Sequence, residues 1–442
     1  MRKRKDNLNL LMKEGIISYF DVRMDDNYFD GENYALYLEQ KVTFGAFKLK
    51  DIYEQNDTRQ ALHAYATEVL VSTGIKPEDA GAQADDFVYF MIDIACDTDY
   101  SVEEAANPFL KSVAMKVTME HERMAAYVVS GLLGREISEL YAKYYYTEEM
   151  DAELQKMYED IVLSYDELIR EATWLTEDTR EDLLKKLHNM VFVSGGGMPH
   201  EVHAEDAKVI GEDAFCTMVN VNKRKVQRAK ENIERKLNKA ESSMLSQVVN
   251  SQYSPCNTFT ITVAIMHAPY FDVNADYATN LGGLGMVMAH EIGHAFDSNC
   301  IAYDANGVYN PDRICKEDQE KLVARLKQME VYYSEFTIMD IYHVDGVKTS
   351  GENYADKGAM ECLMNIARTK EEQKKLFENY AYIWCMLTED SLAIDNLMED
   401  VHSPNEVRVN AVLSSTKEFY DLYDVTEGDG MYVAPENRIS RW

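Results

Sequence analysis

Residues 281–297 read LGGLGMVMAHEIGHAFD. This apolar run contains no proline, which predicts a buried helix. Residues four apart lie on the same face of a helix, so His290 and His294 can offer imidazole nitrogens to a single Zn²⁺ ion. Glu291 lies one position along, beside the open coordination position where a general base is needed. We therefore expect one zinc ion per chain at this helix.

A catalytic zinc site generally takes three protein ligands and leaves one position for water. Residues 350–356 read SGENYAD, where Ser350 fits a helix N-cap and Glu352 and Asp356 are four residues apart. One of these carboxylates could bind zinc while the other accepts the N–H of a ligating histidine. In so acidic a chain the same pair also fits a solvated helix face, and spacing alone does not choose between the two interpretations.

Composition restricts the class of protein. The chain has 442 residues, 46% of them hydrophobic, enough for one or two substantial cores. Its formal net charge of −32 argues against partners that are nucleic acids or anionic membranes. It has no apolar run of 18 residues, so we expect no transmembrane segment. These features predict a globular protein that acts on something other than nucleic acid.

Cellular location is predicted from the N-terminus and the cysteines. The basic start, MRKRK, is not followed by the apolar run of a signal peptide. The seven cysteines are odd in number and form no C-x-x-C pair, which favours ordinary thiols in a reducing compartment. We expect a cytoplasmic protein, or an extracytoplasmic one if an upstream segment is missing.

The fold class expected is mainly α with a small β-sheet. Residues 16–40 alternate like a short hairpin, and helical periodicity follows from residue 58 to about 190. Three glycines and a proline at 195–199 form the strongest break, so we place the domain boundary between residues 193 and 194. Beyond it the patterns predict one half-exposed, threonine-rich strand and several helices: the strand at 257–265, and helices near 222–249, 282–297, 351–368, 371–399 and 405–421.

Several motifs occur in a particular order along the chain. They are NSQY at 250–253, HEIGHAFD at 290–297, GENYAD at 351–356, DVHSP at 400–404 followed by Arg408, and a C-terminal segment that begins PEN at 435 and ends in Trp442. In this order they resemble the neprilysin family of zinc metallopeptidases, from about residue 123 onward. Ser251 stands where that family has alanine.

The resemblance implies a thermolysin-like zincin catalytic domain at 194–442 and a partial, reduced helical cap domain at 1–193. It implies His290, His294 and Glu352 as zinc ligands and Glu291 as the general base. It also implies Asp356 as the partner of His290 and His402 as the stabiliser of the oxyanion. The groups expected to bind substrate are Asn250, Ser251 and Arg408, of which Asn250 and Arg408 hold the substrate backbone. The residues expected to line an apolar pocket are Ile265, Tyr270, Met286, Val287, Ile383 and Trp384.

We therefore expect a zinc-dependent metalloendopeptidase that hydrolyses oligopeptides on the amino side of hydrophobic residues, through zinc-activated water. The threonine-rich strand suggests that the substrate docks in extended form along a sheet edge. Chains of the resembling family are considerably longer. The alternative is an incomplete or noncatalytic chain that binds zinc or peptide and needs a complementing N-terminal segment, supplied by a partner chain.

Overall fold

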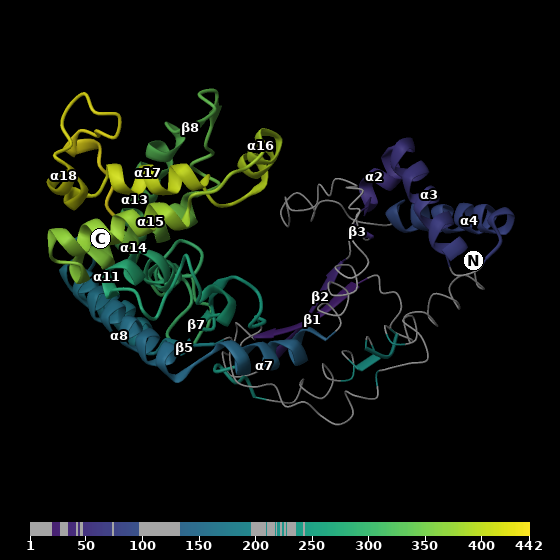
Figure 1. The fold of residues 1–442 in the computed structure, drawn as a ribbon, viewed down its shortest axis with the longest axis horizontal. Helices are drawn as coiled ribbons and strands as arrows, with labels where there is room; N and C mark the ends of the chain where they lie inside the picture. The colour runs from purple at the N-terminus through teal and green to yellow at the C-terminus, as the bar shows by residue number, and fades with distance from the viewer. Residues whose placement is uncertain are drawn as a thin grey trace. The chain divides into compact units, whose positions relative to one another are not determined.

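The structure is a computed structural model, and it describes residues 20–26, 34–40, 43–44, 47–72, 75–96, 133–195, 209, 217, 219–221, 223–224, 227, 236–241 and 244–442. The chain divides into two compact units (Figure 1). The first comprises residues 1–25, 35–126 and 207–233, and the second comprises residues 26–34, 127–206 and 234–442. Each unit is described by itself.

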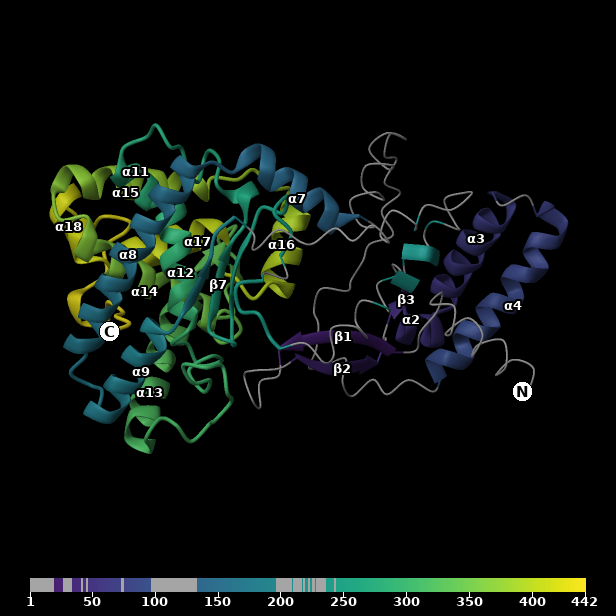
Figure 2. The same ribbon diagram turned by 90° about the horizontal axis from the view of Figure 1, so that it is seen from below.

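Among the residues that the structure describes, the first unit includes two short sheets and the helices α2 to α4. Strands β1 (Phe20–Asp26) and β2 (Tyr34–Gln40) pair with each other, which confirms the predicted hairpin (Figure 2). The remaining elements are β3 (Thr43–Phe44), β4 (Phe47–Lys48), α2 (Leu49–Glu54), α3 (Asn56–Ser72) and α4 (Pro77–Cys96). The three helices contact one another and bury apolar side chains such as Ile52, Leu62 and Met91.

The second unit is mostly helical and contains a three-stranded sheet and a small β8–β9 hairpin. Its helices and turns are α7 (Gly134–Tyr145), α8 (Glu148–Glu171), α9 (Glu177–His188), η4 (Val263–Ile265), α11 (Tyr277–Asn280), η5 (Leu281–Gly285), α12 (Met286–His294), α13 (Lys316–Ser334), α14 (Ser350–Ile366), α15 (Lys370–Ile383), α16 (Asp390–Glu399), α17 (Asn405–Ser414), α18 (Lys417–Tyr423) and η6 (Pro435–Asn437). Its strands are β5 (Val191–Val193), β6 (Ser251–Ser254), β7 (Thr258–Ile261), β8 (Thr337–Ile338) and β9 (Tyr342–His343).

Helix α8 forms one wall of the core around the site helices. Thr147 caps it by accepting the Met150 N–H, and three acidic residues in the first turn favour its N-terminus. Buried apolar residues recur every three or four positions along one face: Met150, Leu154, Met157, Ile161, Tyr165 and Ile169. This face packs on α14 and α12, and the Tyr165 hydroxyl donates to the Ala289 carbonyl at 2.7 Å.

The sheet of the second unit has the strand order β5-β7-β6, with β7 parallel to β5 and antiparallel to β6. The threonine-rich strand β7 was predicted to be half exposed and to offer an edge for the substrate. This prediction is wrong, because β7 is the central strand and all four of its residues are buried. The predicted strand at 257–265 is also too long, because Val263–Ile265 form a 3₁₀ turn. The strand available beside the predicted site is β6, which lies at an edge.

Helix α12 follows a π-helical turn, η5, which contains the glycines of the LGGLG motif. A Cβ atom at Gly282 would collide with the Leu376 carbonyl oxygen of α15, and one at Gly283 with the Tyr270 carbonyl oxygen. The two glycines therefore let the turn approach its neighbours closely. The predicted helix at 282–297 continues as α12 but ends at His294, three residues earlier than predicted, and α12 packs along α14. This pairing brings the two predicted ligand motifs together.

Other predicted elements differ in detail. The stretch 371–399 forms two helices, α15 and α16, with residues 384–389 between them. Most of the predicted helix near 222–249 lies outside the described residues, and it does not extend to 249, because 244–249 form bends and turns. The Asn238 side chain accepts the Ala240 N–H, and this local hydrogen bond competes with helix formation. Ser350 is not an N-cap, because α14 begins at Ser350 itself and its cap position is Thr349.

The predicted boundary at 193–194 does not coincide with the division into compact units. Helices α7 to α9 and strand β5 precede that boundary yet belong to the second unit. The physical reason is that β5 pairs in parallel with β7, so the residues before the glycine run supply a strand to the sheet beside the predicted site. None of the described helices is both long and apolar enough to cross a membrane.

Candidate metal centre

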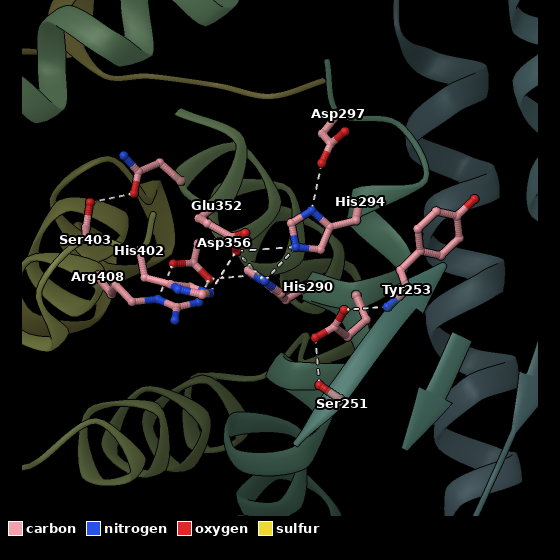
Figure 3. Close-up of polar contacts among 12 residues, drawn as sticks. Ser251, Tyr253, His290, His294, Asp297, Glu352, Asp356, His402, Ser403 and Arg408 are labelled. Carbon is pink, nitrogen blue, oxygen red and sulfur yellow. Dashed lines mark hydrogen bonds and ion pairs between the residues drawn. The ribbon is translucent and has the colours of Figure 1, made fainter. Parts of the chain in front are cut away.

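Two packed helices and one loop supply the polar cluster (Figure 3). His290 and His294 project from one face of α12, and Glu352 comes from the first turn of α14. Their ligand-capable atoms all lie within 4.8 Å of one another. The two Nε2 atoms are 3.0 Å apart, and Glu352 Oε2 lies 3.1 Å from Nε2 of His290 and 3.4 Å from that of His294. The structure thus brings the three predicted ligands together.

His402 completes the cluster from the loop before α17. Its Nε2 lies 3.2 Å from Glu352 Oε2, so three imidazoles face one carboxylate oxygen. This oxygen is buried, and it makes no hydrogen bond of acceptable geometry to the part of the chain that the structure describes. An anionic oxygen that faces nitrogens without such a bond is the arrangement expected of ligands that converge on a cation. The donor set of two histidines and one glutamate is one that catalytic zinc uses. The residues therefore fit a zinc ion.

Aspartates hold the outer nitrogens of these imidazoles. Asp356 Oδ1 lies 2.7 Å from Nδ1 of His290, which is the predicted partnership. Asp297 Oδ2 lies 2.7 Å from Nδ1 of His294. Sequence reasoning missed Asp297, although it ends the HEIGHAFD run three residues after His294, a spacing that meets on one helical turn. An acceptor at Nδ1 turns the Nε2 lone pair toward the centre.

Asp400 is the second residue that the sequence did not single out. Its Oδ1 lies 2.7 Å from Nδ1 of His402, two residues along the chain, and also accepts the His402 backbone N–H. Ser403 donates to Asn353 Oδ1 at 2.7 Å and ties this loop to α14. The signal in the sequence was the DVHSP motif, whose aspartate precedes the histidine by two positions.

These neighbours change the charge of the cluster. Burial lowers the pKa of His290, but the charge and hydrogen bond of Asp356 together with the hydrogen bond of Glu352 outweigh it, and the net shift is upward. Burial likewise lowers the pKa of His294, while Asp297 and Glu352 raise it well above its usual value. Burial raises the pKa of Glu352, but the imidazoles hold it far below its usual range. Without a cation the cluster therefore retains protons, and a metal ion must displace them to bind.

The Glu291 side chain is directed toward strand β6. Its Oε1 accepts the Ser251 hydroxyl at 2.7 Å and its Oε2 accepts the Tyr253 backbone N–H at 2.8 Å. The side chain is nearly buried. It therefore presents a carboxylate between the histidine helix and the edge strand of the sheet.

Asp356 is shared between a histidine and an arginine. Arg408, on α17, donates from Nε and Nη2 to the two oxygens of Asp356, each at 2.7 Å. The Arg408 guanidinium also lies over the Trp384 ring, 4.0 Å from its centroid. Both Asp356 and Arg408 are buried, and their mutual attraction fixes the charged form of each. Arg408 was predicted to hold the substrate backbone, and here two of its nitrogens bind Asp356.

A cavity of about 300 Å³ opens onto these residues. It contains most of the predicted substrate-binding residues, namely Asn250, Ser251, Ile265, Tyr270, Met286, Val287, Trp384 and Arg408. Ile383 was predicted to line the apolar pocket but does not line this cavity. It is the last residue of α15 and lies buried in the hydrophobic core, because its neighbour Trp384 takes the position facing the cavity. Asn250 accepts the Ser251 N–H through Oδ1 at 2.9 Å.

Comparisons with known proteins agree with this geometry. The family model described as peptidase family M13 matches residues 250–439, and a second model with the same description matches residues 93–196. Neutral endopeptidase from Lactococcus lactis subsp. lactis is 30% identical over 319 residues, which is 68% of this chain and 48% of that protein. Human neprilysin is 24% identical over 382 residues, which cover 80% of this chain and 50% of the neprilysin chain. The chain spans about half the length of these curated relatives.

Solved structures confirm the predicted fold class. The Mycobacterium tuberculosis zinc metalloprotease ZMP1 in complex with an inhibitor aligns with a TM-score of 0.77 at 19% identity, over 98% of this chain and 82% of that one. PEPO from Lactobacillus rhamnosis aligns with a TM-score of 0.76 at 19% identity, over 98% and 84%. At such identities these matches show the fold alone, a mainly α zincin fold with small sheets. Two models of one family match more than half of the residues, and the chain therefore belongs to peptidase family M13, the neprilysin family of zinc metallopeptidases.

Proposed function

We propose that this chain is a zinc-dependent metalloendopeptidase that cleaves oligopeptides on the amino side of hydrophobic residues. The observation that carries the proposal is the convergence of His290, His294 and Glu352, with Glu291 beside them on the same helix. A zinc ion held there supplies Lewis acidity and lowers the pKa of the attacking water. The relatives are named neutral endopeptidase and neprilysin, which supports the same class of reaction.

Glu291 and His402 have different roles in the proposed reaction. Glu291 accepts the proton of the attacking water and later returns it to the leaving amine. His402 donates from Nε2 to the oxyanion that develops on the scissile carbonyl. Burial lowers the pKa of His402, but Asp400 and Glu352 outweigh it and raise the pKa to about 9. When protonated on both nitrogens, His402 can donate to Asp400 and to the oxyanion together.

Substrate recognition follows from the cavity and the sheet. Strand β6 is an edge of the three-stranded sheet and lies against Glu291, which supports an extended peptide paired main chain to main chain with it. The apolar cavity residues Ile265, Tyr270, Met286 and Val287 suit a large hydrophobic side chain next to the cleaved bond. We infer that β6, rather than the central strand β7, carries the substrate.

A fluorogenic peptide with a bulky apolar residue after the scissile bond tests this function. We expect Glu291→Gln to retain zinc and lose at least about a thousandfold in kcat, because it removes the proton acceptor. His294→Ala should lose both zinc and activity. Glu317→Gln is the matched control, since this glutamate is exposed at the start of α13. An active Glu291→Gln enzyme, or activity that survives complete removal of zinc, would contradict the proposal.

The second candidate is a chain that binds zinc or peptide without cleaving it and needs a complementing chain. The observation behind it is that the chain spans about half the length of its curated relatives. A folded, zinc-loaded protein that fails to cleave alone, but cleaves after addition of the missing portion of a relative, would support it. The free thiols of Cys300, Cys315, Cys362 and Cys385 support our proposal of a reducing, cytoplasmic location.

A further inference from the structure

The Glu291 carboxylate is attached to strand β6 at both of its oxygens. The Ser251 hydroxyl donates to Oε1 at 2.7 Å, and the Tyr253 N–H donates to Oε2 at 2.8 Å. Ser251 and Tyr253 are two residues apart on one strand, so the side-chain hydroxyl of the first and the main-chain N–H of the second can reach one carboxylate. Exposed fractions of 8% for Ser251 and 9% for Glu291 mean that little water competes with these bonds.

The two donors do different things to the carboxylate. The terminal torsion of a glutamate side chain is broad, so one hydrogen bond leaves the carboxylate free to rotate about it. A second bond to the other oxygen fixes the plane of the group. The Tyr253 donor is a main-chain N–H group, so it is present whatever side chain residue 253 carries. The Ser251 donor is a side-chain hydroxyl, so a substitution at this position can remove it.

The orientation of this plane matters for proton transfer. Each oxygen of Glu291 accepts one hydrogen bond from β6, so its remaining lone pairs are directed away from the strand. Proton transfer requires a lone pair within hydrogen-bond reach of the water, and small misplacements cost rate. A hydroxyl that fixes the plane therefore acts on the step in which Glu291 accepts the proton.

We propose that Ser251 is a positioning residue that acts through Glu291 rather than a residue that binds substrate. The inference rests on the proposed function, since it concerns the same reaction. It differs from the sequence-based expectation, which placed Ser251 among the substrate-binding groups. Its hydroxyl donates to Glu291, and the orientation of the carboxylate is what it contributes.

The test compares Ser251→Ala and Ser251→Thr with Ser391→Ala. Loss of a hydrogen bond to a charged group predicts a roughly tenfold fall in kcat for Ser251→Ala, with KM within about twofold and zinc content unchanged. Threonine keeps a hydroxyl, so Ser251→Thr should recover kcat to within about threefold. Ser391 is an exposed serine of α16 and does not line the cavity. Its alanine variant should match the parent.

Crystal structures of the metal-free parent and of Ser251→Ala give a readout besides activity. We expect one orientation of the Glu291 carboxylate in the parent and a rotated or divided one in the variant. An unchanged or higher kcat in Ser251→Ala, a rise in KM alone, or failure of threonine to restore kcat would overturn the proposal. If the parent itself cleaves nothing, the proposed function fails, and an unmoved carboxylate in the variant crystal would then overturn the role of Ser251 separately.

Discussion

At the scale of single residues, the cluster repeats one arrangement three times. Each imidazole that faces Glu352 has an aspartate oxygen 2.7 Å from its Nδ1. The aspartates differ in exposure: Asp356 and Asp297 are buried, whereas Asp400 is partly exposed. A buried carboxylate at Nδ1 orients a histidine ligand and increases its basicity, which strengthens metal binding. His402, with the more exposed partner, is the one assigned to the substrate rather than to the metal.

Asp297→Asn tests this arrangement. The amide keeps the shape of the side chain but loses the charge, so we expect the zinc dissociation constant to rise about 10- to 100-fold. Competition with a chromophoric chelator at constant pH measures the constant. Asp312→Asn, at an exposed position whose backbone N–H bonds to Asn310, should leave it unchanged. Equal zinc affinity in the parent and Asp297→Asn would show that Asp297 only closes the turn after α12.

The site could be predicted from the sequence where the ligands share one helix. The spacing of His290 and His294 is sufficient, because the geometry of a helix places them on one face. Glu352 could not be assigned by spacing, since its role depends on the packing of α14 against α12. The contact between Ser251 and Glu291 depends on the register of β6 beside that helix, and no local pattern carries such information. Long-range packing accounts for what the sequence left open.

At the scale of elements, a carboxylate ties two helices of the second unit together. Asp318, in the first turn of α13, accepts the Thr176 N–H at 3.0 Å and the Thr176 hydroxyl at 2.6 Å. Thr176 occupies the N-cap position of α9, which begins at Glu177. Burial raises the pKa of Asp318, but its hydrogen bonds outweigh burial and lower the pKa to about 2. The charged form is therefore the one that the fold stabilises.

This shift predicts a pH-dependent stability. A carboxyl whose pKa is lowered on folding stabilises the protein above its unfolded pKa of about 4, and the contribution is lost as pH falls toward 2. We expect the Asp318 carboxyl to contribute about 2 kcal/mol to the free energy of unfolding at pH 6, and about half of this contribution to remain at pH 3. Urea unfolding of the metal-free protein and of Asp318→Asn measures it. Because asparagine does not titrate, the difference between the two should shrink by about 1 kcal/mol over this interval. A constant difference would rule out this role.

Helices were predicted better than strands, for physical reasons. The acidic first turn of α9 and the regular apolar spacing along α8 are local signals. The threonines of β7 alternate with apolar residues as in a half-exposed strand, yet Thr258 and Thr260 are buried. Thr262, which follows the strand, is also buried, and its hydroxyl lies within hydrogen-bond distance of the Val248 and Asn250 carbonyl oxygens. A buried threonine with such partners keeps the sequence pattern of an exposed one. The position of β7 in the sheet could therefore not be predicted from its composition.

At the scale of the whole molecule, charge is the dominant feature. All residues of the metal cluster belong to the second unit, within a chain whose formal net charge is −32. Within the cavity, the positive charge of Arg408 is paired with Asp356, and Asp400 accompanies His402. The field of such a chain attracts cationic molecules and repels anionic ones over distances set by ionic strength. Peptide charge should therefore influence the rate of capture in addition to the residue at the cleaved bond.

Two peptides with the same cleavable bond, one flanked by three lysines and the other by three glutamates, test this prediction on the active enzyme. At about 20 mM salt we expect kcat/KM for the lysine peptide to be at least about tenfold higher, because steering raises the association rate. At about 0.5 M salt the screening length is only a few ångströms, so the ratio should fall to about two or less. An uncharged peptide is the control and should show little dependence on salt. A preference for lysine that does not change with salt would assign the selectivity to contacts in the cavity, and equal rates at low salt would show that the net charge has no part in capture.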